Sequence, residues 1–143
     1  MDSMFLGCTS LKSINLSSFD TTNIQNMVGM FYNCKSLKSI DLSNFKTRAL
    51  VKMGNMFKNC SSLKEIDLST FDIHSKCVHV DNLFNGCSNL ERLDLTCFNK
   101  NNSIDDAYDM FKGCKAISYI KCTKEFRDWC WEHYDYVELP KNM

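Results

Sequence analysis

Apolar residues recur along the chain with a period of 26 or 27 residues. The clearest marker is an apolar residue followed by phenylalanine, which stands at Met4-Phe5, Met30-Phe31, Met56-Phe57, Leu83-Phe84 and Met110-Phe111. Four residues after the first member of each pair comes a cysteine: Cys8, Cys34, Cys60, Cys87 and Cys114. Self-similarity at a fixed period over nearly the whole chain predicts an array of stacked repeat units.

Each unit contains a short segment in which apolar and polar residues alternate. In the second unit this segment is Leu37-Lys38-Ser39-Ile40-Asp41-Leu42. The alternation of Ile40, Asp41 and Leu42 predicts a short strand with one buried face. Because equivalent segments stack on each other, we expect five parallel strands about 4.8 Å apart.

The stretch before each Met-Phe pair has apolar residues at helical spacing. In the second unit Ile24, Met27, Met30 and Phe31 fall at i, i+3, i+6 and i+7, which predicts a short helix before each strand. A glycine or asparagine stands just before each cysteine: Gly7, Asn33, Asn59, Gly86 and Gly113. These two residue types best tolerate a positive φ at a helix end.

The last twenty residues depart from the repeat. Residues 124–137 read as an amphipathic helix with its apolar stripe at Phe126, Trp129, Cys130, His133, Tyr134 and Val137. We expect Trp129 to cover the last unit and Trp131 to face away from it. The predicted fold class is an α/β repeat solenoid of leucine-rich-repeat type. Residues 1–123 would form five coils starting near residues 1, 27, 53, 80 and 107, each with one short parallel strand and one short helix, and residues 124–143 a helical cap.

The first unit lacks a comparable cap, because Met1 already occupies the repeat position of Met27 and Met53. An open coil exposes its core, so the pattern predicts end-to-end self-association through this N-terminal coil.

Composition narrows the function classes. Lys and Arg together number 17, as do Asp and Glu, so the net charge is zero. The chain as a whole has no basic field that would attract nucleic acid, and no run of about 20 apolar residues that would insert into a membrane. No signal peptide is visible at the start of the chain.

Nine cysteines are present, and most of them fall in repeat positions. We interpret the five-cysteine column as small buried residues at the turn into the strand, rather than as a metal or disulfide site. Cys77 and Cys122 occupy columns of apolar residues and are expected in the core, whereas Cys97 aligns with polar residues and is expected at the surface. Cys130 lies in the C-terminal segment, and the redox state of Cys97 and Cys130 stays open. The grouping His74-x-x-Cys77-x-His79 matches no common zinc spacing.

The strand positions that alternate with core residues define the predicted partner-binding face. They are Ser39, Asp41, Ser43, Glu65, Asp67, Ser69, Arg92, Asp94, Thr96, Tyr119 and Lys121, preceded by Ser13, Asn15 and Ser17. Asp41, Asp67 and Asp94 would stack as like charges on adjacent strands, which is unfavourable unless hydroxyl groups, water, a cation or a basic partner compensates.

The repeat M-F-x-[GN]-C-x-[SN]-L-x-x-[IL]-[DN]-L-[ST]-x-F resembles the BspA-like leucine-rich repeat of bacterial surface proteins. The segment Phe19-Asp20-Thr21-Thr22-Asn23-Ile24-Gln25-Asn26-Met27 is similar to the family's F-D-T-S-x-V-T-x-M, and later units drift from it. The resemblance implies a secreted or cell-surface protein that attaches to host proteins or to neighbouring cells. It implies no catalytic residues.

These observations predict an adhesin-type protein-binding module. The alternative is a structural spacer whose repeats only project another domain. An enzyme is not expected, because no nucleophile–base pair with an orienting group and no phosphate-cradling glycine loop stands in the sequence. No cofactor or metal is expected either.

Overall fold

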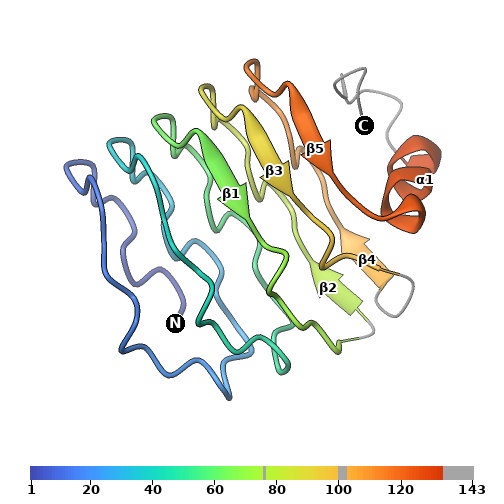
Figure 1. The fold of residues 1–143 in the computed structure, drawn as a ribbon, viewed down its shortest axis with the longest axis horizontal. Helices are drawn as coiled ribbons and strands as arrows, with labels where there is room; N and C mark the ends of the chain where they lie inside the picture. The colour runs from blue at the N-terminus through green and yellow to red at the C-terminus, as the bar shows by residue number, and fades with distance from the viewer. Residues whose placement is uncertain (76, 100–102, 134–143) are drawn as a thin grey trace.

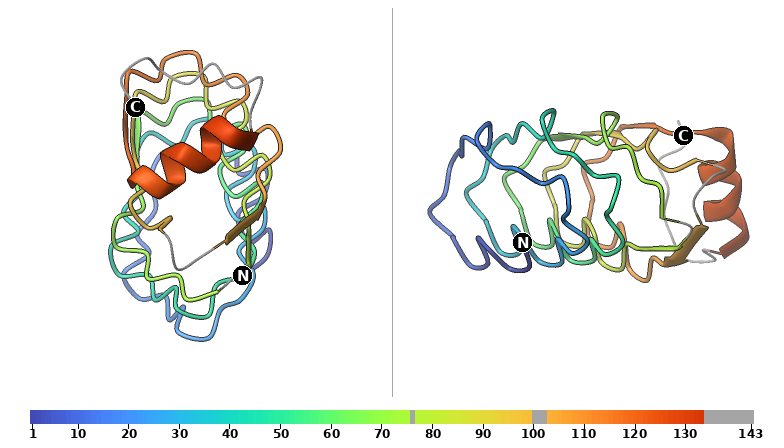
Figure 2. Two further views of the ribbon diagram at one scale, coloured as in Figure 1. Left: turned by 90° about the vertical axis from the view of Figure 1, so that its right-hand side faces the viewer. Right: turned by 90° about the horizontal axis from the view of Figure 1, so that it is seen from below.

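The computed structural model describes residues 1–75, 77–99 and 103–133. Successive repeat units lie side by side as stacked turns of chain, with the N-terminal unit at one end and a helix across the other (Figures 1 and 2). The larger sheet is parallel, has the order β1-β3-β5 and consists of β1 (Glu65–Asp67), β3 (Arg92–Asp94) and β5 (Tyr119–Lys121).

A second, two-stranded parallel sheet lies apart from the first. It pairs β2 (Cys77–His79) with β4 (Ser103–Asp106). Single parallel bridges continue this ladder toward the N-terminus, joining Asn26 to Lys52 and Lys52 to His79. The apolar pattern does not indicate this ladder, because its residues belong to the stretches whose spacing predicts a helix.

The predicted helix in each unit is wrong. Among the described residues the single helix is α1 (Lys124–His133). In the second unit every other backbone amide instead donates to the next unit: Met27 to Lys52 O at 2.8 Å, Gly29 to Gly54 O at 3.0 Å and Phe31 to Met56 O at 2.9 Å. The amides of Met30 and Tyr32 between them bond back only three residues. A helix would have to use all of these donors within its own segment.

Backbone angles give the second reason. Gly29 has a φ of 60° and Asn33 a φ of 62°, and the next unit repeats this with Asn55 at 57° and Asn59 at 61°. Two left-handed residues four positions apart interrupt any right-handed helix. The stretch is therefore a run of tight turns, and the predicted fold class, an α/β leucine-rich-repeat solenoid with a helix in every coil, is contradicted.

The predicted five-strand sheet is also not observed among the described residues, which form the three strands β1, β3 and β5 on this side. Residues 12–17 and 38–43 run beside them without being strands (Figure 1). The side-chain amide of Asn44 donates to Leu16 O and Ser17 O, both at 3.1 Å. Side-chain hydrogen bonds thus satisfy carbonyls that a regular ladder would otherwise use.

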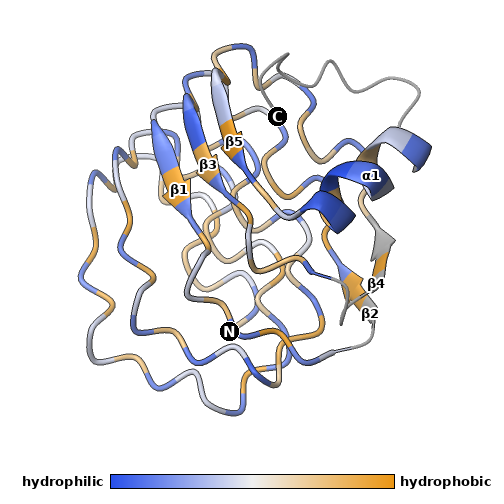
Figure 3. Ribbon diagram, turned by 45° about the vertical axis from the view of Figure 1, so that its right-hand side comes forward, coloured by the Kyte–Doolittle hydropathy of each residue, from blue (hydrophilic) through white to orange (hydrophobic). Residues whose placement is uncertain are grey.

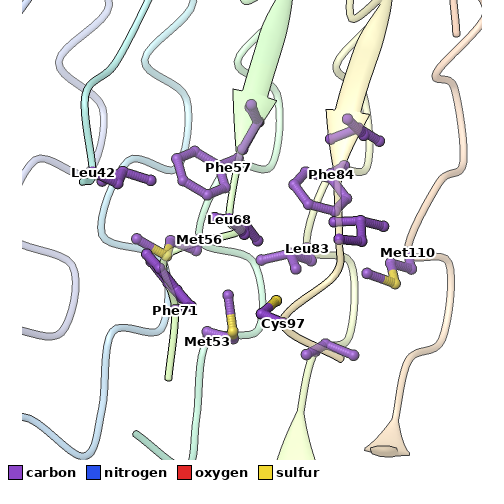
Figure 4. Close-up of a cluster of buried hydrophobic side chains, with 14 of the residues drawn as sticks. Leu42, Met53, Met56, Phe57, Leu68, Phe71, Leu83, Phe84, Cys97 and Met110 are labelled. Atoms are coloured by element: carbon purple, nitrogen blue, oxygen red, sulfur yellow. The ribbon is translucent and has the colours of Figure 1, made fainter. Parts of the chain in front are cut away.

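The core is a column of stacked phenylalanines on the turn side. Neighbouring rings lie 5.4 to 6.1 Å apart, at interplanar angles of 6° to 15°, in the series Phe5, Phe31, Phe57, Phe84 and Phe111. Figure 4 shows Phe57 and Phe84 with the methionine and leucine side chains packed beside them. One repeat of 26 or 27 residues therefore carries the chain from one stacked ring to the next.

The cysteine column runs beside the phenylalanines. Each thiol donates to the carbonyl of a phenylalanine in the preceding unit: Cys34 to Phe5 at 3.2 Å, Cys60 to Phe31 at 3.1 Å, Cys87 to Phe57 and Cys114 to Phe84 at 3.0 Å. Cys34, Cys60 and Cys87 are fully buried, whereas Cys8 is exposed. These thiols link successive units and are part of the packing.

Helix α1 closes the C-terminal end of the stack. The Thr123 hydroxyl accepts the amide of Phe126 at 3.2 Å, as a residue preceding a helix does, and donates to Phe98 O at 2.7 Å. Phe126 stacks on Phe98 at 5.3 Å, and Trp129 stacks on Phe126 at 6.4 Å. The outer side of the helix is polar (Figure 3). It also carries Trp131, which was predicted to face away from the last unit and has an exposed fraction of 69%.

One cysteine lies elsewhere than predicted. Cys97 was expected at the surface but is buried, with an exposed fraction of 3%, and Figure 4 places it among core side chains. The repeat column that Cys97 shares with polar residues therefore does not keep its side chain out of the core. Cys122 is half-buried against the core. The side chain of Cys77, like Tyr134 and Val137, lies outside the described part of the chain.

No helix in the described residues has both the length and the apolar character needed to cross a bilayer.

Candidate binding surface

The outward face of the three-stranded sheet carries two rows of side chains. Strand pairing aligns Glu65 with Arg92 and Tyr119 in the first row, and Asp67 with Asp94 and Lys121 in the second. The residues between the rows point inward and are almost completely buried: Ile66, Leu93 and Ile120. The alternation predicted from sequence therefore places the six charged or aromatic residues on one surface.

Arg92 and Tyr119 form a pair within the first row. The guanidinium carbon lies 4.7 Å from the centre of the tyrosine ring, which is cation–π geometry. Tyr119 keeps an exposed fraction of 40%. Because each side chain restrains the other, the aromatic ring and the cation are held together on the surface. Nothing in the spacing of single residues indicated this contact.

Lys121 and Asp94 form an ion pair within the second row, with Nζ 2.9 Å from Oδ2. The hydrogen bond to Asp94 raises the pKa of Lys121. Partial burial opposes ionisation of Asp94, but hydrogen bonds from Thr96 and Lys121 outweigh it and leave the pKa of Asp94 lowered. One of the stacked carboxylates is thus neutralised by a cation of the same chain.

The asparagine and the aspartates that stack in the second row also accept hydrogen bonds from backbone amides. The side-chain oxygens of Asn15, Asp41, Asp67 and Asp94 each accept the amide two residues further on, at 2.8 to 3.0 Å. For Asp41 the hydrogen bonds from Ser43 lower the pKa of the carboxyl group. Each aspartate therefore stabilises the turn at the end of its own segment, which offsets the repulsion expected between neighbours.

A shallow hollow of about 290 Å³ lies on this face. Its lining includes both rows, Glu65, Asp67, Arg92, Asp94, Tyr119 and Lys121, above the edges of Ile66 and Leu93. The remaining residues of the predicted face, Ser39, Asp41, Ser43, Ser69 and Thr96, lie outside the hollow. The structure thus brings together six of the predicted site residues and separates them from the other five.

Most of the cysteines whose side chains the structure describes are in surroundings that disfavour the thiolate. Burial raises the pKa of Cys34 to about 11, and of Cys60, Cys97, Cys114 and Cys130 to about 12. A thiol with so high a pKa stays protonated and is a poor nucleophile at neutral pH.

The histidine grouping noted in the sequence does not come together as a site. His74 pairs with Asp72, with Nε2 2.8 Å from Oδ1. Within residues 1–75, 77–99 and 103–133, no three histidine, cysteine or acidic side chains are grouped as metal ligands.

The repeat units also match a known family model. The family model described as Mycoplasma protein of unknown function, DUF285, matches residues 1–124. The chain belongs to this family. The match spans the repeat units and reaches the first residue of α1, and the resemblance to BspA-like repeats stays a prediction. No curated protein and no solved structure matches the chain.

Proposed function

We propose that this member of the DUF285 family is a protein-binding module that recognises its partner through the outward face of β1, β3 and β5. The observation that carries the proposal is the hollow on this face. It is lined by Tyr119, half-exposed and held by Arg92 at 4.7 Å, and on the far strand β1 by Glu65 and Asp67, which form no ion pair with another described residue. Tyrosine and arginine are enriched at protein interfaces, where they supply large contact area at a low entropic cost.

The setting of the face supports the same proposal. The strands are joined to the buried core through Ile66, Leu93 and Ile120, so their outward side chains start from a rigid base. Binding groups held on a rigid scaffold lose less entropy on association than groups on mobile loops. By analogy with the BspA-like repeat, we further propose an adhesin-type role at the cell surface or in secretion, with a host or neighbouring-cell protein as partner.

A binding assay with paired variants tests the face. The chain is immobilised and incubated with a detergent extract of surface proteins, and captured proteins are identified by mass spectrometry. Arg92→Ala with Tyr119→Ala removes the cation and the ring from the face. Tyr108→Ala with Lys112→Ala is the matched control, because it removes one exposed tyrosine and one exposed cation elsewhere.

The proposal predicts a protein that is captured by the wild type and the control but lost from the face variant. Equal capture by all three chains would contradict it. That result would favour the alternative of a structural spacer. The spacer has one observation in its favour, since Asp41, Asp67 and Asp94 are already engaged by backbone amides of their own units.

A further inference from the structure

The two halves of the chain differ in charge, although the total is neutral. Residues 1–64 carry eight Lys and Arg residues against three Asp and Glu residues, and residues 65–143 carry nine against fourteen. Residues 1–64 are therefore basic, and the location of their lysines decides whether this excess forms a basic surface.

Half of these cations lie at one edge of the stack, on the turns that lead into the strand side. The turn segments 8–12, 34–38 and 60–64 read Cys-Thr-Ser-Leu-Lys, Cys-Lys-Ser-Leu-Lys and Cys-Ser-Ser-Leu-Lys, without an acidic residue. Their lysines, which we call the lysine ridge, are Lys12, Lys35, Lys38 and Lys64, and all four are exposed.

Hydrogen bonds hold these turns in register. The amide of Lys38 donates to Lys12 O at 3.1 Å, and the hydroxyl of Ser61 donates to Lys35 O at 3.4 Å. The thiols of Cys34 and Cys60 tie the same turns to the unit before them. Lysines of neighbouring units are thus fixed about one strand spacing, roughly 5 Å, apart at their backbones.

The ridge ends in the fourth unit. Glu91 occupies the position of Lys12, Lys38 and Lys64, and its carboxylate lies 3.7 Å from Lys64 Nζ. Lys12, Lys35 and Lys38 have no carboxylate of the described residues within ion-pair distance. A straight row of like charges at this spacing is unfavourable by itself, and an anionic polymer lying along the row would relieve it.

We propose that the lysine ridge binds a linear sulfated polysaccharide, which lies across the turns of the first three units. The composition of the ridge supports this class of polymer. Exposed Thr9 and Ser10, with Ser36 and Ser62 partly exposed, offer hydroxyl groups beside the ammonium groups, and both donate hydrogen bonds to sulfate oxygens. The three turn segments contain no aromatic residue, so they lack the stacking platforms with which proteins hold single-stranded nucleic acid.

This site is separate from the proposed protein-binding face, and the two can fail independently. The experiment measures binding of fluorescent heparin, a sulfated polysaccharide, to the full chain by anisotropy. Lys12→Ser, Lys35→Ser and Lys38→Ser are combined in a ridge variant. Lys46→Ser, Arg48→Ser and Lys52→Ser form the control, which removes the same charge from exposed positions of the same half of the chain.

The wild type and the control are expected to bind heparin, with affinity falling by roughly 20- to 150-fold for a fourfold rise in salt concentration, as three to four cationic contacts imply. The ridge variant is expected to bind at least about tenfold more weakly than the control, since three contacts are lost. Circular dichroism checks that both variants are folded. Glu91→Lys extends the ridge by one unit and should tighten binding, which an unfolded protein could not do.

Three results would overturn the proposal. They are equal weakening of both triple variants, no gain from Glu91→Lys, and binding of a short DNA duplex as tight as that of heparin. Loss of heparin binding with Arg92→Ala and Tyr119→Ala would also count against it, because it would place the polysaccharide on the sheet face.

Discussion

The two sides of each repeat unit follow different rules. On the turn side the same residue types recur from unit to unit in stacked columns of phenylalanine and cysteine, which are fully buried in the middle of the stack. On the strand side the first outward row changes in every unit, from Ser39 to Glu65, Arg92 and Tyr119, whereas Asp41, Asp67 and Asp94 recur in the second row. The turn side therefore contributes most of the stability, and the first outward row of the strand side is free to vary.

The largest effect is expected from Phe57→Ala on the turn side. Phe57 has no exposed surface and stacks on Phe31 at 5.7 Å and on Phe84 at 6.1 Å. Truncating a buried phenylalanine costs about 3–5 kcal/mol of unfolding free energy. Chemical denaturation measures this loss of unfolding free energy. Glu65→Ala on the strand side serves as the control, and a comparable loss there would remove the distinction between the two sides.

Gly86→Ala tests how closely the turns approach each other. A methyl group at Gly86 would lie 2.1 Å from the Asn59 side-chain oxygen, and the φ of +78° is unfavourable for alanine. We expect a loss of about 1–3 kcal/mol in unfolding free energy. Gly7→Ala has a similar φ of +74° with no atom within 4 Å, so it isolates the backbone effect. Equal losses at both positions would show that the contact with Asn59 is unimportant.

Cys60→Ala tests the thiol column. The substitution removes a buried sulfur and its hydrogen bond to Phe31 O at 3.1 Å. A loss of about 1–2 kcal/mol is expected from the lost packing and contact. The same substitution at exposed Cys8 should leave thermal stability nearly unchanged. If Cys8→Ala were as destabilising as Cys60→Ala, the column would not act through burial.

The smallest effect is expected on the strand side, from Asp41→Asn. Hydrogen bonds from Ser43 lower the pKa of Asp41 below its ordinary value of 3.8. Its contribution to stability is therefore present above that value and disappears as the pH falls through the lower pKa of the folded state. Asp41→Asn should slightly reduce the fall in melting temperature on acidification. A variant whose acid sensitivity exceeds that of the wild type would contradict this account.

The period, the columns and the positions of three strands could be predicted from the sequence. Phe31, Phe57 and Phe84 recur at a fixed interval because equivalent residues of successive units stack on each other. Ile66, Leu93 and Ile120 alternate with polar residues because one face of each strand is buried. The prediction of a helix in each unit failed because apolar spacing is the same for a helical stripe and for this run of turns. The sequence signal for the turns is the pair Gly29 and Asn33, four residues apart, because both residue types tolerate the positive φ that each adopts.

The predicted binding face was assembled only in part. Alternation alone placed Arg92, Tyr119, Asp94 and Lys121 on one surface, but it could not show which of them touch. Side-chain length and rotamer decide that Arg92 covers Tyr119 and that Lys121 reaches Asp94. The burial of Cys97 likewise could not be predicted from its repeat column, because its counterparts Ser18 and Thr70 are exposed whereas Cys97 lies in the core.

Sequence by itself thus determined which residues occupy equivalent places, because that information is local and repeated in every unit. Tertiary structure decided where each backbone amide finds its acceptor. An amide such as that of Phe31 can bond within its own turn or to the next unit, and the neighbouring carbonyl of Met56 at 2.9 Å settles the choice. The reason is physical: a hydrogen bond between units exists only once the units have stacked, and that stacking is absent from any single segment of the chain.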